Sequence, residues 1–405
     1  MSFAYLDRPM SDPIDPQLTI LVPAMDEEET ISTFVAWCHE GIREAGLVGE
    51  ILIVDSSTDS TPDLALAGGA RVLRTSPKGL GAAYIEGIPH VRGAFVIMGD
   101  ADCTYDFRQL SQFVRAWESG SKFVMGSRFK GSIEPGAMPK LHQYFGTPIT
   151  TWLLNKIFGG SFSDIHCGMR GVDADTLREM RISSTSWEYA SEMVIKAIQL
   201  ELPISEVPIN FYADRGSRQS HMKRRGHLEP FRAGWSNVKS MLTYGAPYFL
   251  RRPGQIFLLL GLIGFMFLFL GPISLGPIEL SGSTRLVAVF VAILGLQMVL
   301  LAHIAEAVMD YTGLRRDRLK HRFNLDRMFL ICGGLGVGGV ALILPLLLNY
   351  ASNGMRLVNI PEWQESFVLA GLLLIICGFC LFTASLVIQS IAVRFSELAP
   401  MLDNM

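Results

Sequence analysis

Two aspartates that stand two positions apart are the residues in this sequence best suited to chemistry, because their type and spacing suit the binding of a metal ion. Asp100 and Asp102 follow the apolar run AFVIMG, and carboxylates at i and i+2 on an extended segment can address one cation together. Oxygen ligands of this kind suit Mg²⁺ or Mn²⁺, with phosphate oxygens completing the shell. An acidic turn would give the same letters, so the neighbouring residues must decide.

Three more polar groups occur where predicted strands end or helices begin. Asp55 ends the run ILIVD, where a carboxylate can accept hydrogen bonds from a base or ribose, although a turn aspartate would look the same. Lys78 precedes Gly-Leu-Gly at a predicted helix start, which suits a diphosphate. Arg128 ends the run KFVMGSR.

The elements that must position these residues alternate between strands and helices. Helices are expected after Asp26, which with Glu29 resembles a capping box, and from Pro62, Lys78 and about residue 107. Such alternation predicts an α/β domain with a mostly parallel sheet, at whose carboxyl edge ligands bind. Asp55, Asp100, Asp102 and Arg128 should therefore converge. The predicted strands are 18–22, 51–55, 71–75, 94–102 and 122–128.

Composition divides the 405 residues into a charged first part and an apolar second part. The net charge of -3 gives no basic field, so no nucleic-acid partner is expected. Four apolar stretches approach the roughly 20 residues that cross a bilayer. They are predicted at about 256–276, 286–308, 329–350 and 368–391.

Loop charge predicts the orientation of these spans. The connection between the second and third spans is rich in arginine, whereas the first and third connections hold one arginine each. The positive-inside rule then places both termini and the catalytic domain in the cytosol. The N-terminus has no apolar core of signal-peptide length, which agrees with that placement.

The predicted organisation has five parts. A flexible lead precedes the α/β domain, and an amphipathic, interfacial linker helix precedes an all-α transmembrane domain and a cytosolic tail. We expect the glycine-rich run 330–339 to mark close helix packing. The five parts are 1–16, 17–228, 229–253, 254–395 and 396–405.

The order of these motifs resembles family 2 glycosyltransferases with the GT-A fold, within them the polyprenyl-phosphate branch that includes dolichyl-phosphate mannose and glucose synthases. The resemblance covers about residues 17–230. Thr104 stands where the mannose synthases carry a glutamine, so UDP-glucose is preferred over GDP-mannose as donor. The matching segments are Val22-Pro23-Ala24-Met25-Asp26-Glu27, Ile53-Val54-Asp55-Ser56-Ser57, Lys78-Gly79, Asp100-Ala101-Asp102 and Gly126-Ser127-Arg128.

The resemblance implies a role for each site residue. Asp100 and Asp102 would hold Mg²⁺ or Mn²⁺ and the diphosphate, with Lys78 near the diphosphate. Residues 187–193 resemble an acidic helix start that closes over the sugar. The nucleoside would be held by Pro23, Asp26, Glu27 and Asp55. The acceptor phosphate would be bound by Arg128, His142, Arg170, Arg215 and Arg218.

The function implied is transfer of a hexose, with inversion, from a sugar nucleotide to a polyprenyl phosphate such as undecaprenyl or dolichyl phosphate. A phosphate oxygen is already anionic, so the chemistry requires stabilisation of the leaving diphosphate more than a base. Two alternatives stay open: a processive polysaccharide synthase, whose usual Q-x-x-R-W motif is absent from the sequence, and a non-catalytic sugar-nucleotide or lipid-binding protein. Membrane lipid is an expected partner, and homo-oligomerisation is left open.

Overall fold

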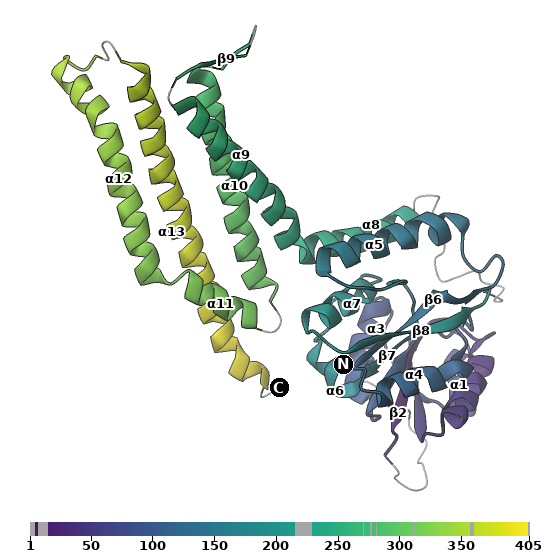
Figure 1. The fold of residues 1–405 in the computed structure, drawn as a ribbon. Helices are drawn as coiled ribbons and strands as arrows, with labels where there is room; N and C mark the ends of the chain where they lie inside the picture. Colours follow the sequence, from purple (N-terminus) through teal and green to yellow (C-terminus); the bar gives the residue numbers. More distant parts are fainter. Residues whose placement is uncertain are drawn as a thin grey trace. The chain divides into compact units, whose positions relative to one another are not determined.

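The chain forms two compact units, Met1–Thr243 and Tyr244–Met405, each described here by itself. The structure is a computed structural model (Figure 1). It describes residues 5–6, 15–214, 229–269, 271–275, 278–280, 282–310, 313–356 and 360–403.

The first unit is built on an eight-stranded sheet in the order β1-β4-β3-β2-β5-β7-β6-β8. Strands β2, β3, β4 and β5 run parallel, β6 is parallel to β8, and β7 is antiparallel to both β5 and β6. The predicted α/β class with a mostly parallel sheet is confirmed. The strands are Tyr5–Leu6, Leu18–Ala24, Gly49–Asp55, Arg71–Arg74, Phe95–Met98, Phe123–Ile133, Arg170–Asp173 and Ile204–Phe211.

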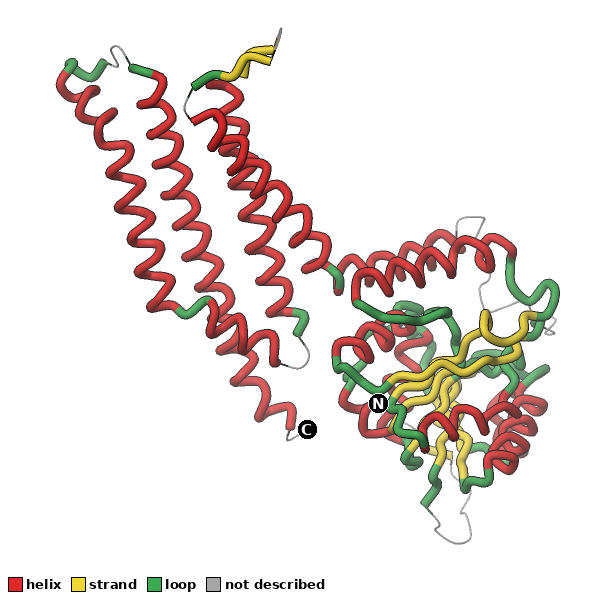
Figure 2. The backbone as a smooth tube through the Cα atoms, viewed as in Figure 1, coloured by secondary structure: helices red, strands yellow, loops and turns green. Residues whose placement is uncertain are grey.

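Helices cover both faces of the sheet, as Figures 1 and 2 show. The central strands β2 and β5 are buried along nearly their whole length, which explains their continuous apolar sequence. The helices of this unit are α1 (Ile31–Ala45), α2 (Thr61–Ala67), α3 (Leu80–Gly87), α4 (Leu110–Glu118), α5 (Thr147–Phe158), α6 (Ala174–Glu179), α7 (Tyr189–Gln199) and α8 (Glu229–Tyr244).

Two local predictions in this unit are wrong. Asp26 does not cap α1, because α1 begins at Ile31 and Asp26 turns at φ 58°, where its carboxylate accepts from the Thr58 backbone instead. Strand β5 ends at Met98 and not at residue 102, so both aspartates lie in the following bend. Within the predicted flexible lead, Tyr5 and Leu6 pair antiparallel with β4.

The second unit contains four helices that are long and apolar enough to cross a membrane. Helices α10, α12 and α13 contain the predicted spans and extend beyond them. The predicted end of the first span at residue 276 is wrong, because α9 ends at Phe269, Gly271 and Pro272 follow, and β9 begins at Ile273. Helix α9 follows α8 after the single residue Gly245, and α13 continues to Asp403. The elements are α9 (Ala246–Phe269), β9 (Ile273–Leu275), β10 (Ile278–Leu280), α10 (Gly282–Val308), α11 (Leu314–Arg322), α12 (Leu325–Ser352) and α13 (Glu362–Asp403).

Close helix packing in this unit occurs mainly between α9 and α10. A Cβ on Gly295 would lie 2.1 Å from the Leu258 nitrogen, and one on Gly261 would lie 2.3 Å from the Ala292 nitrogen. In the glycine-rich run 330–339, a Cβ on Gly339 would lie 2.6 Å from the Gly371 carbonyl oxygen, but a Cβ on Gly333, Gly334 or Gly336 would meet open space. The prediction for that run therefore holds for one face of α12 only.

Candidate active site

Asp100 and Asp102 lie in the bend directly after β5, at the carboxyl edge of the sheet. The Thr104 hydroxyl and backbone N–H both donate to Asp102 Oδ1, at 2.6 and 3.0 Å, and hold its carboxylate in place. Burial raises the pKa of Asp102, and the neighbouring carboxylates of Glu27 and Asp214 raise it further. Negative charge is therefore concentrated at this point.

The carboxylate of Asp100 lies against the segment that precedes β7. A Cβ placed on Gly168 would be 2.8 Å from Asp100 Oδ2 and 2.9 Å from the Tyr105 ring. The Gly168 N–H donates to the Tyr105 hydroxyl at 2.8 Å. Glycine at this position is thus what allows the two segments to approach each other.

Asp55 has its partners within the protein. Its carboxylate is completely buried, accepts from the Ser57 hydroxyl at 2.6 Å and forms an ion pair with Arg74. The Ser57 hydroxyl in turn accepts from the Asp26 backbone N–H at 2.8 Å. Asp55 therefore shapes the loop that carries Asp26 and Ser57, and direct contact with a nucleoside would require this network to open.

Pro23 and Glu27 flank the same loop. Pro23 belongs to β2, and the Glu27 carboxylate accepts from the Thr30 hydroxyl at 2.8 Å while contributing to the charge around Asp102. Of the predicted nucleoside residues, Glu27 is thus the one that the structure brings to the aspartate pair.

The start of α3 is covered by the chain itself. Lys78 is exposed and pairs with Glu86 at 2.7 Å. A Cβ on Gly79 or Gly81 would lie 2.4 or 2.1 Å from the backbone carbonyls of Thr185 and Ser184. The two glycines therefore serve this close approach, and Lys78 is the part of the motif that remains accessible.

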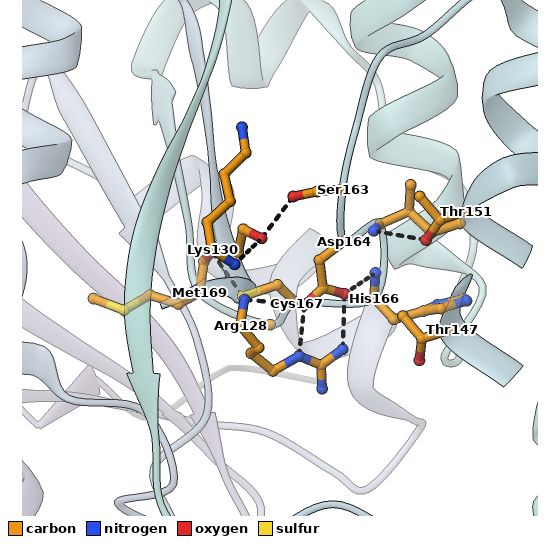
Figure 3. Close-up of polar contacts among 12 residues, drawn as sticks. Arg128, Lys130, Thr147, Thr151, Ser163, Asp164, His166, Cys167 and Met169 are labelled. Carbon is orange, nitrogen blue, oxygen red and sulfur yellow. Dashed lines mark hydrogen bonds and ion pairs between the residues drawn. The ribbon is translucent and has the colours of Figure 1, made fainter. Parts of the chain in front are cut away.

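Arg128 forms a bidentate ion pair with Asp164. Arg128 Nε and Nη2 lie 2.7 and 2.9 Å from the two carboxylate oxygens, and the Arg128 backbone N–H donates to the same group, as Figure 3 shows. Burial alone would raise the pKa of Asp164, but the Arg128 charge holds it below its usual range. The Nη1 amino group takes no part in this pair.

The other predicted phosphate ligands are placed very differently. Arg170 is completely buried and donates to the carbonyls of Cys167 and Ala190, at 2.8 to 3.2 Å, so it supports the fold. His142 is exposed at the start of the turn before α5. Arg215 and Arg218 lie outside the described residues.

The predicted acidic helix start at α7 is an internal support. Glu192 is completely buried, pairs with Lys196 at 2.5 Å and accepts from the backbone of Ser183 and Ser184. Its helical i, i+4 spacing to Lys196 was visible in the sequence, and it indicates such a pair.

Sequence reasoning missed two residues that bear on the site. The Tyr105 hydroxyl accepts from the Gly168 N–H, and the pKa of this phenol is raised by burial and by Asp100 and lowered by Arg128. His166 Nε2 forms a hydrogen bond of 2.8 Å with the Thr150 hydroxyl. Burial lowers the pKa of His166 to about 4, so its imidazole is neutral near pH 7. Their contacts could not be read from the sequence, because the partners lie 16 and 63 positions away.

The donor set at the aspartate pair fits a divalent cation that is completed by a ligand's phosphates. Among the described residues, no group of three or more His, Cys, Asp or Glu is placed to hold a metal ion. We expect Asp100 and Asp102 to be the carboxylates that would hold it, and burial, together with Glu27 and Asp214, raises the pKa of Asp102.

Comparisons with known proteins agree with this architecture. Residues 19–181 match the model of Glycosyl transferase family 2, and residues 300–392 match that of the Glycosyltransferase family 2 C-terminal transmembrane region. The low-salt glycan biosynthesis hexosyltransferase Agl6 of Haloferax volcanii is 33% identical over 81% of this chain and 79% of its own length. The dolichyl-phosphate hexose transferase of the same organism is 26% identical over 56% of this chain and 92% of its own.

Solved structures show more distant similarity. Glucosyl-3-phosphoglycerate synthase from Mycobacterium tuberculosis, in complex with Mn²⁺, UDP-glucose and phosphoglyceric acid, gives a TM-score of 0.43 at 19% identity, over 56% of this chain and 79% of that chain.

An α/β domain followed by four apolar helices and a matching C-terminal region defines an integral membrane glycosyltransferase. The chain belongs to glycosyltransferase family 2.

Proposed function

We propose that this enzyme transfers a hexose from a sugar nucleotide to a polyprenyl phosphate and inverts the anomeric centre. The observation that carries the proposal is the close approach of the aspartate pair Asp100 and Asp102, here called the donor half, to the segment that holds the Arg128–Asp164 pair, here called the acceptor half. A Cβ on Gly168 would lie 2.8 Å from Asp100 Oδ2 and 2.9 Å from the Tyr105 ring, and Gly168 is four residues from the Asp164 that holds Arg128. The charges of both Asp100 and Arg128 act on the Tyr105 phenol. A leaving diphosphate at one half would thus be adjacent to an attacking phosphate at the other.

At the donor half, Asp102 and Asp100 would hold Mg²⁺ or Mn²⁺ together with the diphosphate. The cation, when bound, would stabilise the charge that develops on the leaving group. Thr104 orients Asp102, Glu27 adds negative charge beside it, and Lys78 is accessible to a phosphate nearby. UDP-glucose is the donor that we propose first, on the basis of Thr104.

At the acceptor half, Arg128 would bind the lipid phosphate through its Nη1 group while Asp164 keeps the guanidinium oriented. Exposed His142 is a second candidate, and Arg215 and Arg218 remain candidates. Because the acceptor oxygen is anionic near neutral pH, the protein needs to position it rather than deprotonate it. Arg170 is left out of this set, since its donors are used by backbone carbonyls.

We propose the orientation that places both termini and the active site in the cytosol. We also propose that α8 lies at the membrane interface, and that the glycosyltransferase and transmembrane domains span residues 17–228 and 254–395.

The decisive experiment is transfer of radiolabelled sugar to a C55 polyprenyl phosphate by the detergent-solubilised enzyme, with UDP-glucose and GDP-mannose compared. We expect a lipid-linked monosaccharide whose anomeric configuration is opposite to that of the donor. A polymeric product would favour the processive synthase instead, and no transfer from any sugar nucleotide would favour the binding protein.

The matched variants are Asp102→Asn and Asp175→Asn, the second on the exposed face of α6. Asp102→Asn should lower kcat at least roughly 100-fold, as loss of a group that stabilises charge in the transition state does. Its Tm near pH 7 should not fall, because removing a buried charge with a raised pKa relieves repulsion. Wild-type activity in Asp102→Asn would remove the proposed metal site.

A further inference from the structure

Helix α5 and the turn before it expose a continuous apolar stripe. The opposite face of the helix is buried, with Thr147, Thr151 and Leu154 packed into the first unit. Single exposed apolar side chains are ordinary, but a stripe at helical spacing marks an interaction surface. The stripe consists of Leu141, Tyr144, Phe145, Ile149 and Trp152, whose exposed fractions range from 57% to 63%.

The composition of this stripe fits the interface of a lipid bilayer. Tyrosine and tryptophan prefer the headgroup level, and the exposed Lys140 and Lys156 at its two ends suit anionic headgroups. The chain also tethers the first unit to the bilayer, because Gly245 is the single residue between α8 and the first apolar helix. A soluble partner would have to compete with the bilayer for this stripe.

The buried face of α5 holds the acceptor half of the site. The Thr150 hydroxyl contacts His166 Nε2 at 2.8 Å, and the Thr151 hydroxyl accepts from the Ile165 N–H at 3.4 Å (Figure 3 shows the second contact). At the other end, the Asn155 amide donates to the Phe162 carbonyl at 2.7 Å and accepts from its N–H at 3.1 Å. The segment so fixed contains Asp164, the partner of Arg128.

We infer that α5 docks on the bilayer interface through its apolar stripe, and that this contact sets the height of the Asp164 segment so that Arg128 meets the phosphate of a membrane-embedded acceptor. The second part rests on the proposed function, whereas bilayer docking does not. Helix α5 then couples membrane contact to the acceptor half of the site.

Docking is tested by fluorescence quenching of the full-length protein in proteoliposomes that contain brominated phospholipid. Trp152→Phe should remove a quenchable part of the emission, and the difference from wild type reports on Trp152 alone. Trp117→Phe is the control, because Trp117 is stacked on Phe95 against the sheet and should contribute no quenching. If the Trp152 emission is not quenched by brominated lipid, another part of the protein or a second copy covers the stripe, and the inference is wrong.

Coupling is tested by activity. The double variant Ile149→Ser/Trp152→Ser should lose roughly tenfold in transfer to a long-chain lipid phosphate in vesicles, and change less than about twofold with a short-chain, water-soluble polyprenyl phosphate. Val48→Ser removes an exposed apolar side chain between α1 and β3 and should leave both rates unchanged.

Equal losses on both acceptors would show that α5 only supports the fold and would overturn the coupling. If neither the wild type nor any variant transfers sugar to a lipid phosphate, the proposed function fails, but the quenching result still decides whether α5 docks.

Discussion

The electrostatic surroundings differ among three aspartates of this site, Asp55, Asp102 and Asp164, although each of them follows or precedes an apolar strand. Asp55 and Asp164 are completely buried, and each is neutralised by an arginine, Arg74 and Arg128. Asp102 instead lies beside other carboxylates, and its pKa is raised. Asp102 is the aspartate of the three that we propose to hold a cation, whereas Asp55 and Asp164 support the structure around it.

The Arg128–Asp164 pair leads to a prediction about stability. Arg128→Ala should destabilise the first unit by about 3–5 kcal/mol, because it leaves a buried carboxylate without its partner. The double variant Arg128→Ala/Asp164→Ala should be more stable than the single one. Urea unfolding of the three proteins, followed by tryptophan fluorescence, measures the difference.

The pH dependence of that pair has a definite sign. The folded-state pKa of Asp164 is below its unfolded value, so the pair contributes stability at any pH above about 3.9, the usual pKa of aspartate. This contribution should be lost as the pH falls through the folded-state pKa. A wild-type protein that loses no more stability on acidification than the double variant would contradict the assignment.

At the scale of elements, the approach of the bend after β5 to the segment before β7 determines the site. We expect Gly168→Ala to reduce transfer strongly, because its Cβ would come within 2.8 Å of Asp100 and force the carboxylate aside. Gly336→Ala on α12 is a suitable control, since its Cβ would meet open space and its φ is not positive. Both variants should be assayed for kcat and for Tm, and equal activity of the two would show that Asp100 can shift without consequence.

Helix packing in the second unit gives another prediction at this scale. Gly295→Val should separate α9 from α10 and lower the Tm in detergent, because the added atoms meet the Leu258 backbone. Gly334→Val on α12 should be tolerated, since its Cβ would meet open space. Thermal unfolding of the two variants under the same conditions compares them directly, and a similar Tm for both would argue against tight α9–α10 contact.

At the scale of the whole molecule, the distribution of charge predicts the topology. Arginines are frequent in α11, whereas the connection between α9 and α10 forms a short hairpin with a single acidic residue, Glu279, in its strands. We expect a cysteine placed at Ser274 to react with a membrane-impermeant maleimide added outside intact cells, and one at Arg318 to react only after permeabilisation. The reverse labelling would place the active site outside.

Polar contacts within the second unit join its helices near both ends of α10. Arg285 donates to the Ser366 hydroxyl of α13 at 2.7 Å, and Glu306 forms an ion pair with Arg251 of α9. His303 lies 3.6 Å from the same Glu306 carboxylate. In an apolar surrounding such groups are retained only where they are paired, so these contacts fix which helices are neighbours.

The sequence by itself determined the strand–helix alternation, the division into a charged and an apolar part, and the position of Asp100 and Asp102 after a buried strand, because all of these depend on local pattern and composition. Only the tertiary structure decided that Asp55 and Arg170 are internal supports, that Asp164 orients Arg128, and that α5 exposes an apolar stripe. The charge state and accessibility of a side chain depend on partners brought together from distant positions, and a single sequence does not show which distant residues meet.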